Sequence, residues 1–422
     1  MKLTRPPPSR PTVDPASEPA ETAGARSTVE TLESQNVGVQ WVREHGSSPR
    51  AMRKNAAAGQ MRSLAQVRES LQRGRTPHVQ DHQLVGGVQA LFANAAAKLA
   101  PRHVGMHRLP VPAQPTDQVA LEVFLAPNRH PPKGTAEPAP VASPLPGVSS
   151  PGTCADCPFC TQYQGRSILW RGLRVLPNAY PYAPADSQHL LLLPLEHREQ
   201  NFEKAFFLDA LAFQTRLGPE TRMHFNGKAG NSQPHLHWHA HRERLPLEEA
   251  LASNPAATHE ITTRGDAKLS HFSFHPIGGL LVEGGESSVA ELADRVARHL
   301  DADPTVQGRY NMVLLQRTGS GRGNVRLAIF PRRSAALSYE AEGVGVIKGG
   351  ALDMTGRRTL AKGEVSDEEL MAWRNFLKQT LVPAAEIPGL ERLSASEETV
   401  TPWQTRMPSQ RVPATGQDSQ AN

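Results

Sequence analysis

Residues 230–241, GNSQPHLHWHAH, constrain this chain more than any other stretch. Histidines alternate with apolar residues there, and a period of two is typical of a β-strand with one polar and one buried face. The pattern predicts that His235, His237 and His239 project from one face, where imidazoles suit metal ligation or nucleophilic chemistry better than a hydrophobic core. The glycines of the preceding turn let backbone N–H groups approach a phosphate, and Ser232 adds a hydroxyl.

Cysteine occurs in one short segment only, at Cys154, Cys157 and Cys160. Three residues so close together do not make a disulfide framework, and the Cys-x-x-Cys spacing favours a metal site. Cys154 and Cys157 have the same spacing as Cys157 and Cys160, so Cys154 is an alternative ligand. The absence of other cysteines favours a reducing, cytoplasmic location.

Two stretches of the chain have a similar order of elements, the second more weakly patterned than the first. The first has expected strands at about 168–176 and 188–194, a helix at about 201–217, and strands at about 221–227 and 234–242. The second has an expected strand at 279–283, a helix opened by a capping box at Ser288 and Glu291, strands at 310–317 and 325–332, and a helix opened by Ser366. The second stretch contains no histidine run.

The histidine run resembles the His-φ-His-φ-His-φ motif of the histidine-triad superfamily, in which a Gly/Ser loop precedes the first histidine. Residues 175–182 and 188–197 resemble the first two strands of that family. Cys157-Pro158-Phe159-Cys160 resembles the metal-binding start of its galactose-1-phosphate uridylyltransferase branch. The second stretch resembles the degenerate second half of the two-domain transferases and the diadenosine-tetraphosphate phosphorylases. The match in family order covers about residues 154–245.

The resemblance implies an α+β fold of tandem histidine-triad-like halves, with antiparallel sheets, flanking helices and a degenerate second half. Residues 1–50 are rich in Pro, Ser, Thr, Ala and Glu and are expected to be a disordered tail. The remaining regions are expected to be a helical N-terminal region with a Pro-rich linker at 51–152, a catalytic half at 153–265, a degenerate half at 266–385 and a C-terminal tail at 386–422, in which residues 396–422 are polar and expected to be disordered.

In the family, the middle histidine attacks the α-phosphorus of a nucleotide and forms a nucleotidyl-histidine intermediate; His237 matches it. A neutral imidazole is a competent nucleophile near pH 7. Ser232 matches the serine that stabilises the phosphoryl oxygens. The resemblance implies five further substrate-binding residues, namely Asn226, Gly227, Asn231, Gln233 and His189.

The third position of the triad favours a different branch from the rest of the sequence. Hydrolases of the family carry His there and transferases usually carry Gln, whereas this chain has His239. An imidazole can protonate a leaving group, which suits hydrolysis. The tandem halves and the Cys-x-x-Cys favour a nucleotidyltransferase or phosphorylase acting on a nucleoside polyphosphate or sugar nucleotide. The acceptor stays open between water, phosphate and a sugar phosphate, and a non-catalytic, zinc-stabilised nucleotide-binding module is the alternative from another class.

A structural zinc ion is expected to be held by Cys157, Cys160, His197 and His235, a tetrahedral Cys₂His₂ set. Cys160 is preferred to Cys154 because it completes the family's motif. The ligand atoms are expected to lie within roughly 4 Å of one another, as donors 2.0–2.3 Å from a tetrahedral zinc must. A closed set of four ligands predicts that the metal positions His237 and does not carry the reaction.

The formal net charge is +5, and the N-terminal 78 residues carry all of this excess, with 12 Lys/Arg against 7 Asp/Glu. The remainder is neutral, which argues against a nucleic-acid-binding groove in the main body. No run of eighteen apolar residues occurs, so no transmembrane helix is expected. A nucleotide substrate is the expected partner, and the sequence does not indicate an oligomeric state.

Overall fold

The computed structural model describes residues 64–130, 157–161, 166–182, 184–230, 235–318, 324–336 and 338–395 of the 422-residue chain. The expected tail at 1–50 and most of the Pro-rich linker lie outside these residues. The described part combines helices with sheets that are mainly antiparallel, which confirms the α+β class.

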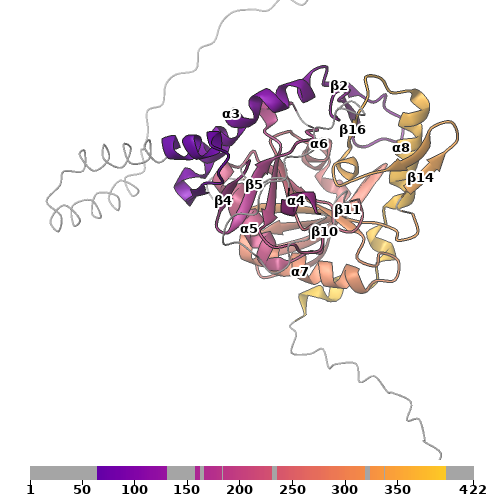
Figure 1. Cartoon of the computed structure of the whole chain (residues 1–422). Coiled ribbons are helices and arrows are strands. Elements are labelled where there is room, and N and C mark those ends of the chain that lie inside the picture. Colours follow the sequence, from indigo (N-terminus) through magenta and orange to yellow (C-terminus); the bar gives the residue numbers. More distant parts are fainter. Residues whose placement is uncertain are drawn as a thin grey trace, which may run out of the picture. The chain divides into compact units, whose positions relative to one another are not determined.

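The N-terminal region contributes one long helix and three short strands (Figure 1). After helical residues 64–72, its elements are β1 (His78–Val79), η1 (Asp81–Gln83), α3 (Leu84–His103), β2 (His107–Pro110) and β3 (Glu122–Leu125). The helix α3 lies in the region that was expected to be helical. β1 pairs in parallel with β4 (Ile168–Trp170), so this region supplies the edge strand of the main sheet.

The first half follows the predicted order of strands around one helix. Its elements are α4 (Pro158–Thr161), β4 (Ile168–Trp170), β5 (Leu173–Pro177), η2 (Ala185–Ser187), β6 (Leu190–Pro194), α5 (Lys204–Leu217), β7 (Arg222–Phe225) and β8 (Trp238–His241). The strand expected at 168–176 is a hairpin, because Arg171 and Gly172 both adopt positive φ between β4 and β5. α5 ends at Gly218, whose φ of 111° few other residues adopt.

The second half repeats this order. Its elements are α6 (Pro246–Ser253), η3 (Pro255–Ala257), β9 (Thr258–Arg264), β10 (Ala267–Phe274), β11 (Ile277–Gly284), α7 (Glu286–Ala302), β12 (Tyr310–Leu314) and β13 (Val325–Pro331). β9 pairs with β10, so it belongs to this half although the expected boundary at residue 265 lies after it. The C-terminal elements are β14 (Ser338–Ala341), β15 (Gly345–Lys348), η4 (Asp353–Thr355), β16 (Arg357–Leu360), α8 (Asp367–Thr380), η5 (Ala384–Glu386) and η6 (Leu390–Ser394).

One 11-stranded sheet runs through both halves in the order β1-β4-β5-β6-β8-β7-β12-β13-β11-β10-β9. Apart from β1 at one edge, the two halves have the same strand order, β4-β5-β6-β8-β7 in the first and β9-β10-β11-β13-β12 in the second. The two halves meet where β7 pairs antiparallel with β12. The halves therefore have the same topology and are joined through equivalent strands. Two smaller sheets, β14-β15 and β16-β3-β2, complete the fold.

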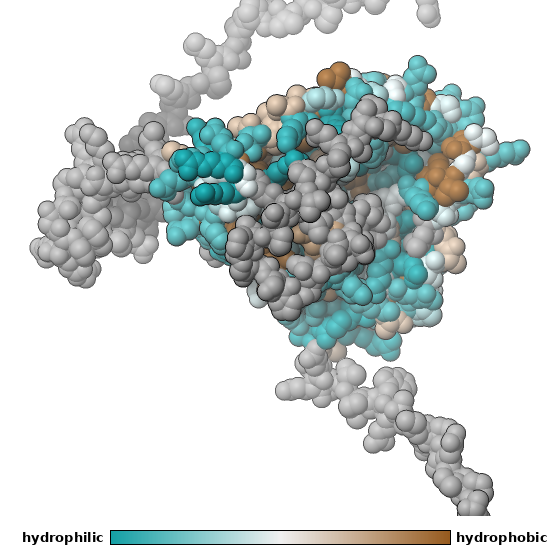
Figure 2. All heavy atoms as spheres, in the orientation of Figure 1, coloured by the Kyte–Doolittle hydropathy of each residue, from teal (hydrophilic) through white to brown (hydrophobic). Residues whose placement is uncertain are grey.

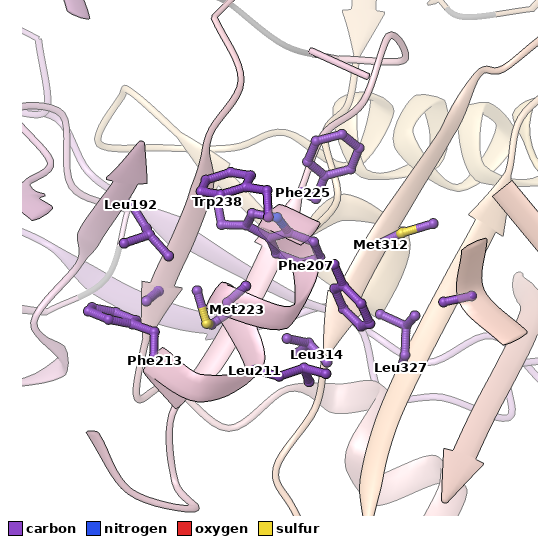
Figure 3. Close-up of a cluster of buried hydrophobic side chains, with 14 of the residues drawn as sticks. Leu192, Phe207, Leu211, Phe213, Met223, Phe225, Trp238, Met312, Leu314 and Leu327 are labelled. Atoms are coloured by element: carbon purple, nitrogen blue, oxygen red, sulfur yellow. The ribbon is translucent and has the colours of Figure 1, made fainter. Parts of the chain in front are cut away.

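Each face of the large sheet has its own hydrophobic core. Helices α3, α5 and α7 cover one face, and Figure 3 shows side chains of α5 such as Phe207 and Phe213 packed against Met223 and Trp238 of the strands. The buried positions of α5 recur every three or four residues, as expected for an amphipathic helix. On the other face, α6, α8 and β3 pack against β10 to β13.

Three details differ from the expectation or sharpen it. The helix α7 begins after Gly285, whose N–H donates to Asp266, so Ser288 lies inside the helix and does not cap it. Ser366 does cap α8, with the reciprocal bonds to Glu369 of a capping box. Residues 386–395, expected in the C-terminal tail, are ordered because Ile387 and Leu390 are buried in the helix-side core. Residues 396–422 lie outside the described part.

The visible face of the molecule is mainly hydrophilic, and its more hydrophobic patches are small (Figure 2). Within the described residues, no helix combines the length and the apolar character needed to cross a membrane.

Candidate functional site

The histidine run alternates between the two faces of the sheet, as its period predicts. Trp238 and Ala240 are buried in the core beneath α5. His237 and His239 point to the opposite face and line a cavity there. The regular strand β8 begins only at Trp238, so His237 lies immediately before it.

His237 is held from both sides through its backbone and its ring. Its N–H donates to Gln200 Oε1 at 2.9 Å, and its carbonyl accepts from Gln200 Nε2 at 3.1 Å. The ring Nδ1 lies 2.6 Å from the carbonyl oxygen of His235, which can only accept, so Nδ1 carries the proton. The Nε2 atom then has a free lone pair, and it lies 3.1 Å from His239 Nε2.

Further histidines form a buried layer behind His239. The ring of His224, on β7, stacks on His239 with centroids 4.4 Å apart and planes inclined by 4°. The Tyr182 hydroxyl makes a short hydrogen bond to His224 Nε2. His189 Nε2 lies 3.1 Å from His239 Nδ1. His224 therefore packs against one face of the His239 ring, and His189 contacts its Nδ1 edge.

Burial keeps these imidazoles neutral. It lowers the pKa of His237 to about 4 and that of His235 to about 4. It also holds the pKa values of His189, His224 and His239 well below the ordinary histidine value. A neutral imidazole has a nucleophilic lone pair at pH 7, whereas an imidazolium has none.

The cavity beside His237 and His239 has a volume of about 510 Å³. Its first wall consists of the histidines, Asn178 and Tyr182 from the first half. The opposite wall comes from residues 348–359, at the end of β15 and in η4 and β16. Arg129, which follows β3, also lines the cavity. The site therefore depends on three regions that are far apart in the sequence.

Positive charge predominates in the cavity. Arg358 pairs with Asp353 at 2.7 Å. Arg129 and Lys348 form no ion pair within 4 Å among the residues that the structure describes. The Arg129 guanidinium lies 5.4 Å from the Tyr182 ring centroid, and desolvation lowers its pKa. Two cations without carboxylate partners give the cavity the charge that an anionic ligand needs.

Only some of the residues expected to bind substrate line the cavity. Asn226 lines the cavity, and its Oδ1 accepts from the Ala351 N–H at 2.8 Å, which ties β7 to the opposite wall. His189 lies one layer behind the cavity wall. Gly227 has φ 56° and packs so tightly against the Tyr310 carbonyl that an added Cβ would lie 2.4 Å from it. Its conformation and this contact explain the glycine, and it does not line the cavity. Asn231, Ser232 and Gln233 lie outside the described residues.

Four residues next to this cavity can hold a metal ion. The ligand atoms of Cys157, Cys160, His197 and His235 all lie within 4.8 Å of one another. Cys160 Sγ is 3.6 Å from His197 Nδ1. His235 Nδ1 lies 2.9 Å from the Leu236 carbonyl, which leaves Nε2 available as a ligand. The predicted set of four residues is therefore brought together as a possible metal site.

The cluster is wider than the expected separation of roughly 4 Å. Its largest separation of 4.8 Å requires the four side chains to move slightly inward around an ion. The donor set nevertheless fits a tetrahedral ion, since two thiols and two imidazoles converge without a carboxylate. Cys154, the alternative ligand, lies outside the described residues.

Comparison of the sequence with models of known protein families finds no matching family, and comparison with curated proteins finds no match. What the site does must therefore be inferred from its geometry and chemistry.

Several residues of the site have little local signal in the sequence. Gln200 lies in a loop between β6 and α5, and nothing in its neighbourhood indicates that it holds His237. The wall at 348–359 comes from a region with an ordinary strand and turn pattern. His224 could have been found, because Arg222 and His224 alternate with Met223 and Phe225 in the way that His237 and His239 alternate with apolar residues.

Proposed function

We propose that the protein transfers a nucleotidyl group through a covalent intermediate on His237, in the manner of the histidine-triad enzymes that its sequence resembles. The observation that carries this proposal is the state of His237. Its Nδ1–H is committed to the His235 carbonyl, and its neutral Nε2 lies at the wall of a cationic cavity.

In the first step, the lone pair of His237 Nε2 attacks the α-phosphorus of a nucleoside polyphosphate or sugar nucleotide. A P–N bond forms, and the P–O bond to the leaving group breaks with its electron pair on oxygen. In the second step, an acceptor oxygen attacks the same phosphorus and loses its proton, and the P–N bond breaks to restore the lone pair. The phosphates of the substrate bind near Arg129 and Lys348, which form no ion pair within 4 Å among the described residues.

The same residues make hydrolysis the second candidate. His239 Nε2 lies 3.1 Å from His237 Nε2, where an imidazole can exchange a proton with a leaving group or with water. In the resembling family this third position is His in hydrolases and usually Gln in transferases. The intermediate on His237 is common to both candidates, and only the acceptor differs.

The metal in this proposal is a structural zinc ion held by Cys157, Cys160, His197 and His235. When bound, zinc supplies a cross-link and no open coordination position, because the four protein ligands complete a tetrahedron. The cross-link fixes His235, whose carbonyl orients the His237 ring. The chemistry of the transfer is carried by the histidines.

The proposal is tested by incubating the protein with nucleoside polyphosphates and sugar nucleotides labelled in the α-phosphate, and by identifying the products. Phosphate and a sugar phosphate are varied as acceptors against water alone. We expect turnover with at least one nucleotide, and its loss in His237→Gln but not in the control His271→Gln, on β10 of the second half. Nucleotide binding without turnover would instead indicate a nucleotide-binding module.

A further inference from the structure

Four side chains are linked in one hydrogen-bonded series that ends at the proposed nucleophile. Asn178 Nδ2 lies 3.1 Å from His189 Nε2, and His189 Nε2 lies 3.1 Å from His239 Nδ1. His239 Nε2 lies 3.1 Å from His237 Nε2. All four residues are buried, so water does not compete for these contacts.

The direction of the series is set at Asn178. The N–H of Tyr180 donates to Asn178 Oδ1 at 2.9 Å, which identifies that atom as the oxygen of the amide. The amide nitrogen of Asn178 therefore faces His189 and donates to its Nε2. His189 is neutral because burial holds its pKa well below the ordinary value, so its single proton lies on Nδ1. That nitrogen has no hydrogen-bond partner among the described residues in either tautomer, so it does not decide between them.

The tautomer of His189 determines that of His239. The lone pair on His189 Nε2 faces His239 Nδ1, which must donate and therefore carries the proton. The remaining nitrogen of His239, Nε2, then has a lone pair that points at His237. The Nδ1 proton of His237 is committed to the His235 carbonyl, so His237 Nε2 also has a lone pair.

The lone pairs of His239 Nε2 and His237 Nε2 therefore face each other across 3.1 Å. No proton lies between these two atoms. In the opposite set of tautomers, His239 Nε2–H would donate to His237 Nε2 and occupy the lone pair that has to attack phosphorus. The contacts among the three histidines would then be normal hydrogen bonds, but the His189 Nε2–H would face the donating amide nitrogen of Asn178, and the nucleophile would be blocked.

We propose that Asn178 is a positioning residue that sets the tautomers of His189 and His239 and so keeps the Nε2 lone pair of His237 free for attack. The inference rests on the proposed function of His237. Asn178 acts through His189 and His239, and both ends of its amide are already used within the protein.

Asn178→Asp is the sharpest variant, because a carboxylate of the same shape can only accept from His189. His189 Nε2 becomes a donor, and the reversal is passed to His239, whose proton moves to Nε2. Asn375→Asp, on α8, is the control for an added carboxylate. The full-length chain is labelled with ¹⁵N-histidine, and the chemical shifts of the ring nitrogens give the tautomer of each ring directly.

The wild type is expected to show protonated Nδ1 on His189, His237 and His239. Asn178→Asp is expected to move the His239 proton to Nε2 and to slow nucleotidylation by at least roughly tenfold, while the control does neither. A wild-type His239 that is protonated on Nε2 would overturn the inference without any variant, and so would unchanged tautomers in Asn178→Asp. If the tautomers respond as expected but no nucleotide ever modifies the wild type, the positioning role stands and the proposed function fails.

Discussion

The two halves of the large sheet have the same strand order but very different side chains at matching positions. The strand pair β7–β8 can be matched to the pair β12–β13 with the same sequence offset for both strands. Val313 and Ala328 then occupy the positions of His224 and His239. These two residues belong to the apolar core that packs against α6 and α8. The same backbone therefore supports a polar cavity in one half and a closed core in the other.

The metal end of the site differs in the same way. The alignment places Arg326 at the position of His237, and Arg326 Nε pairs with Glu283 at 2.8 Å. The second half therefore has an ion pair at the position where the first half has the proposed nucleophile. It nevertheless contributes to function as we propose it, because Lys348 and the loop that follows form the opposite wall of the cavity. In the function that we propose, the first half therefore supplies the histidines and the second half completes the cavity wall.

The largest expected effect comes from exchanging residues at the nucleophile position. His237→Arg, which introduces the residue of the second half, should reduce turnover by several orders of magnitude because a covalent catalyst is removed. Arg326→His should leave turnover near the wild-type value. Steady-state kinetics with the identified nucleotide measures both, and substantial turnover by His237→Arg would show that the two positions do not differ in chemistry.

The next effect concerns the candidate metal cluster, which has no counterpart among the described residues of the second half. Cys160→Ser should lower the bound metal measured by elemental analysis and reduce the free energy of unfolding by about 4 kcal/mol where free metal is about a thousand times its Kd. Glu283→Gln breaks only a partly exposed ion pair and should cost about 0–1 kcal/mol. Equal losses of stability in the two variants would argue against a bound metal.

A pH effect distinguishes the two halves. Burial holds the pKa of His241 well below its usual value, so the unfolded chain binds a proton that the folded chain does not. This contribution to stability is present above the unfolded pKa of about 6.5 and is lost as pH falls towards the folded pKa, at up to about 1.4 kcal/mol per pH unit. Phe330 occupies the matching position. His241→Phe should therefore make the free energy of unfolding less dependent on pH below 6.5, as measured by urea denaturation across pH. An unchanged pH dependence would contradict the burial of His241 in its neutral form.

The smallest effect tests the contribution of the second half to binding. Lys348→Met removes a cation from the cavity wall and should raise KM by up to roughly tenfold with little change in kcat, as expected for loss of a uniform binding contact. Lys378→Met, on α8, is the matched control. If KM is unchanged, the second half does not contact the substrate through this side chain.

Local patterns predicted the elements that are periodic and the ligands that have a fixed spacing. The alternation around His237 predicted the face of the sheet on which this side chain lies. The spacing of Cys157 and Cys160 predicted two of the four residues that the structure brings together as a possible metal site. The histidine-triad assignment itself stays a prediction. The contacts of Gln200 and Asn178 could not be predicted, because each joins segments that become neighbours only after the sheet has formed.

The start of α7 shows how a local rule can fail. Ser288 and Glu291 have the spacing of a capping box, yet the helix starts at Glu286 because Gly285 is fixed by Asp266 from the preceding hairpin. The far wall of the cavity was missed for the same physical reason. It depends on Arg332, whose Nη1 donates to the Gly349 carbonyl at 2.8 Å and holds the loop in place.

The central claim is that His237 accepts a nucleotidyl group, and mass spectrometry of the intact protein after brief exposure to the nucleotide tests it most directly. We predict an added mass of one nucleoside monophosphate, stable in base and labile in acid as a phosphoramidate is, that maps to the peptide containing His237 and is absent from His237→Gln. Turnover without this adduct, or an adduct on another residue that persists in His237→Gln, would contradict the account.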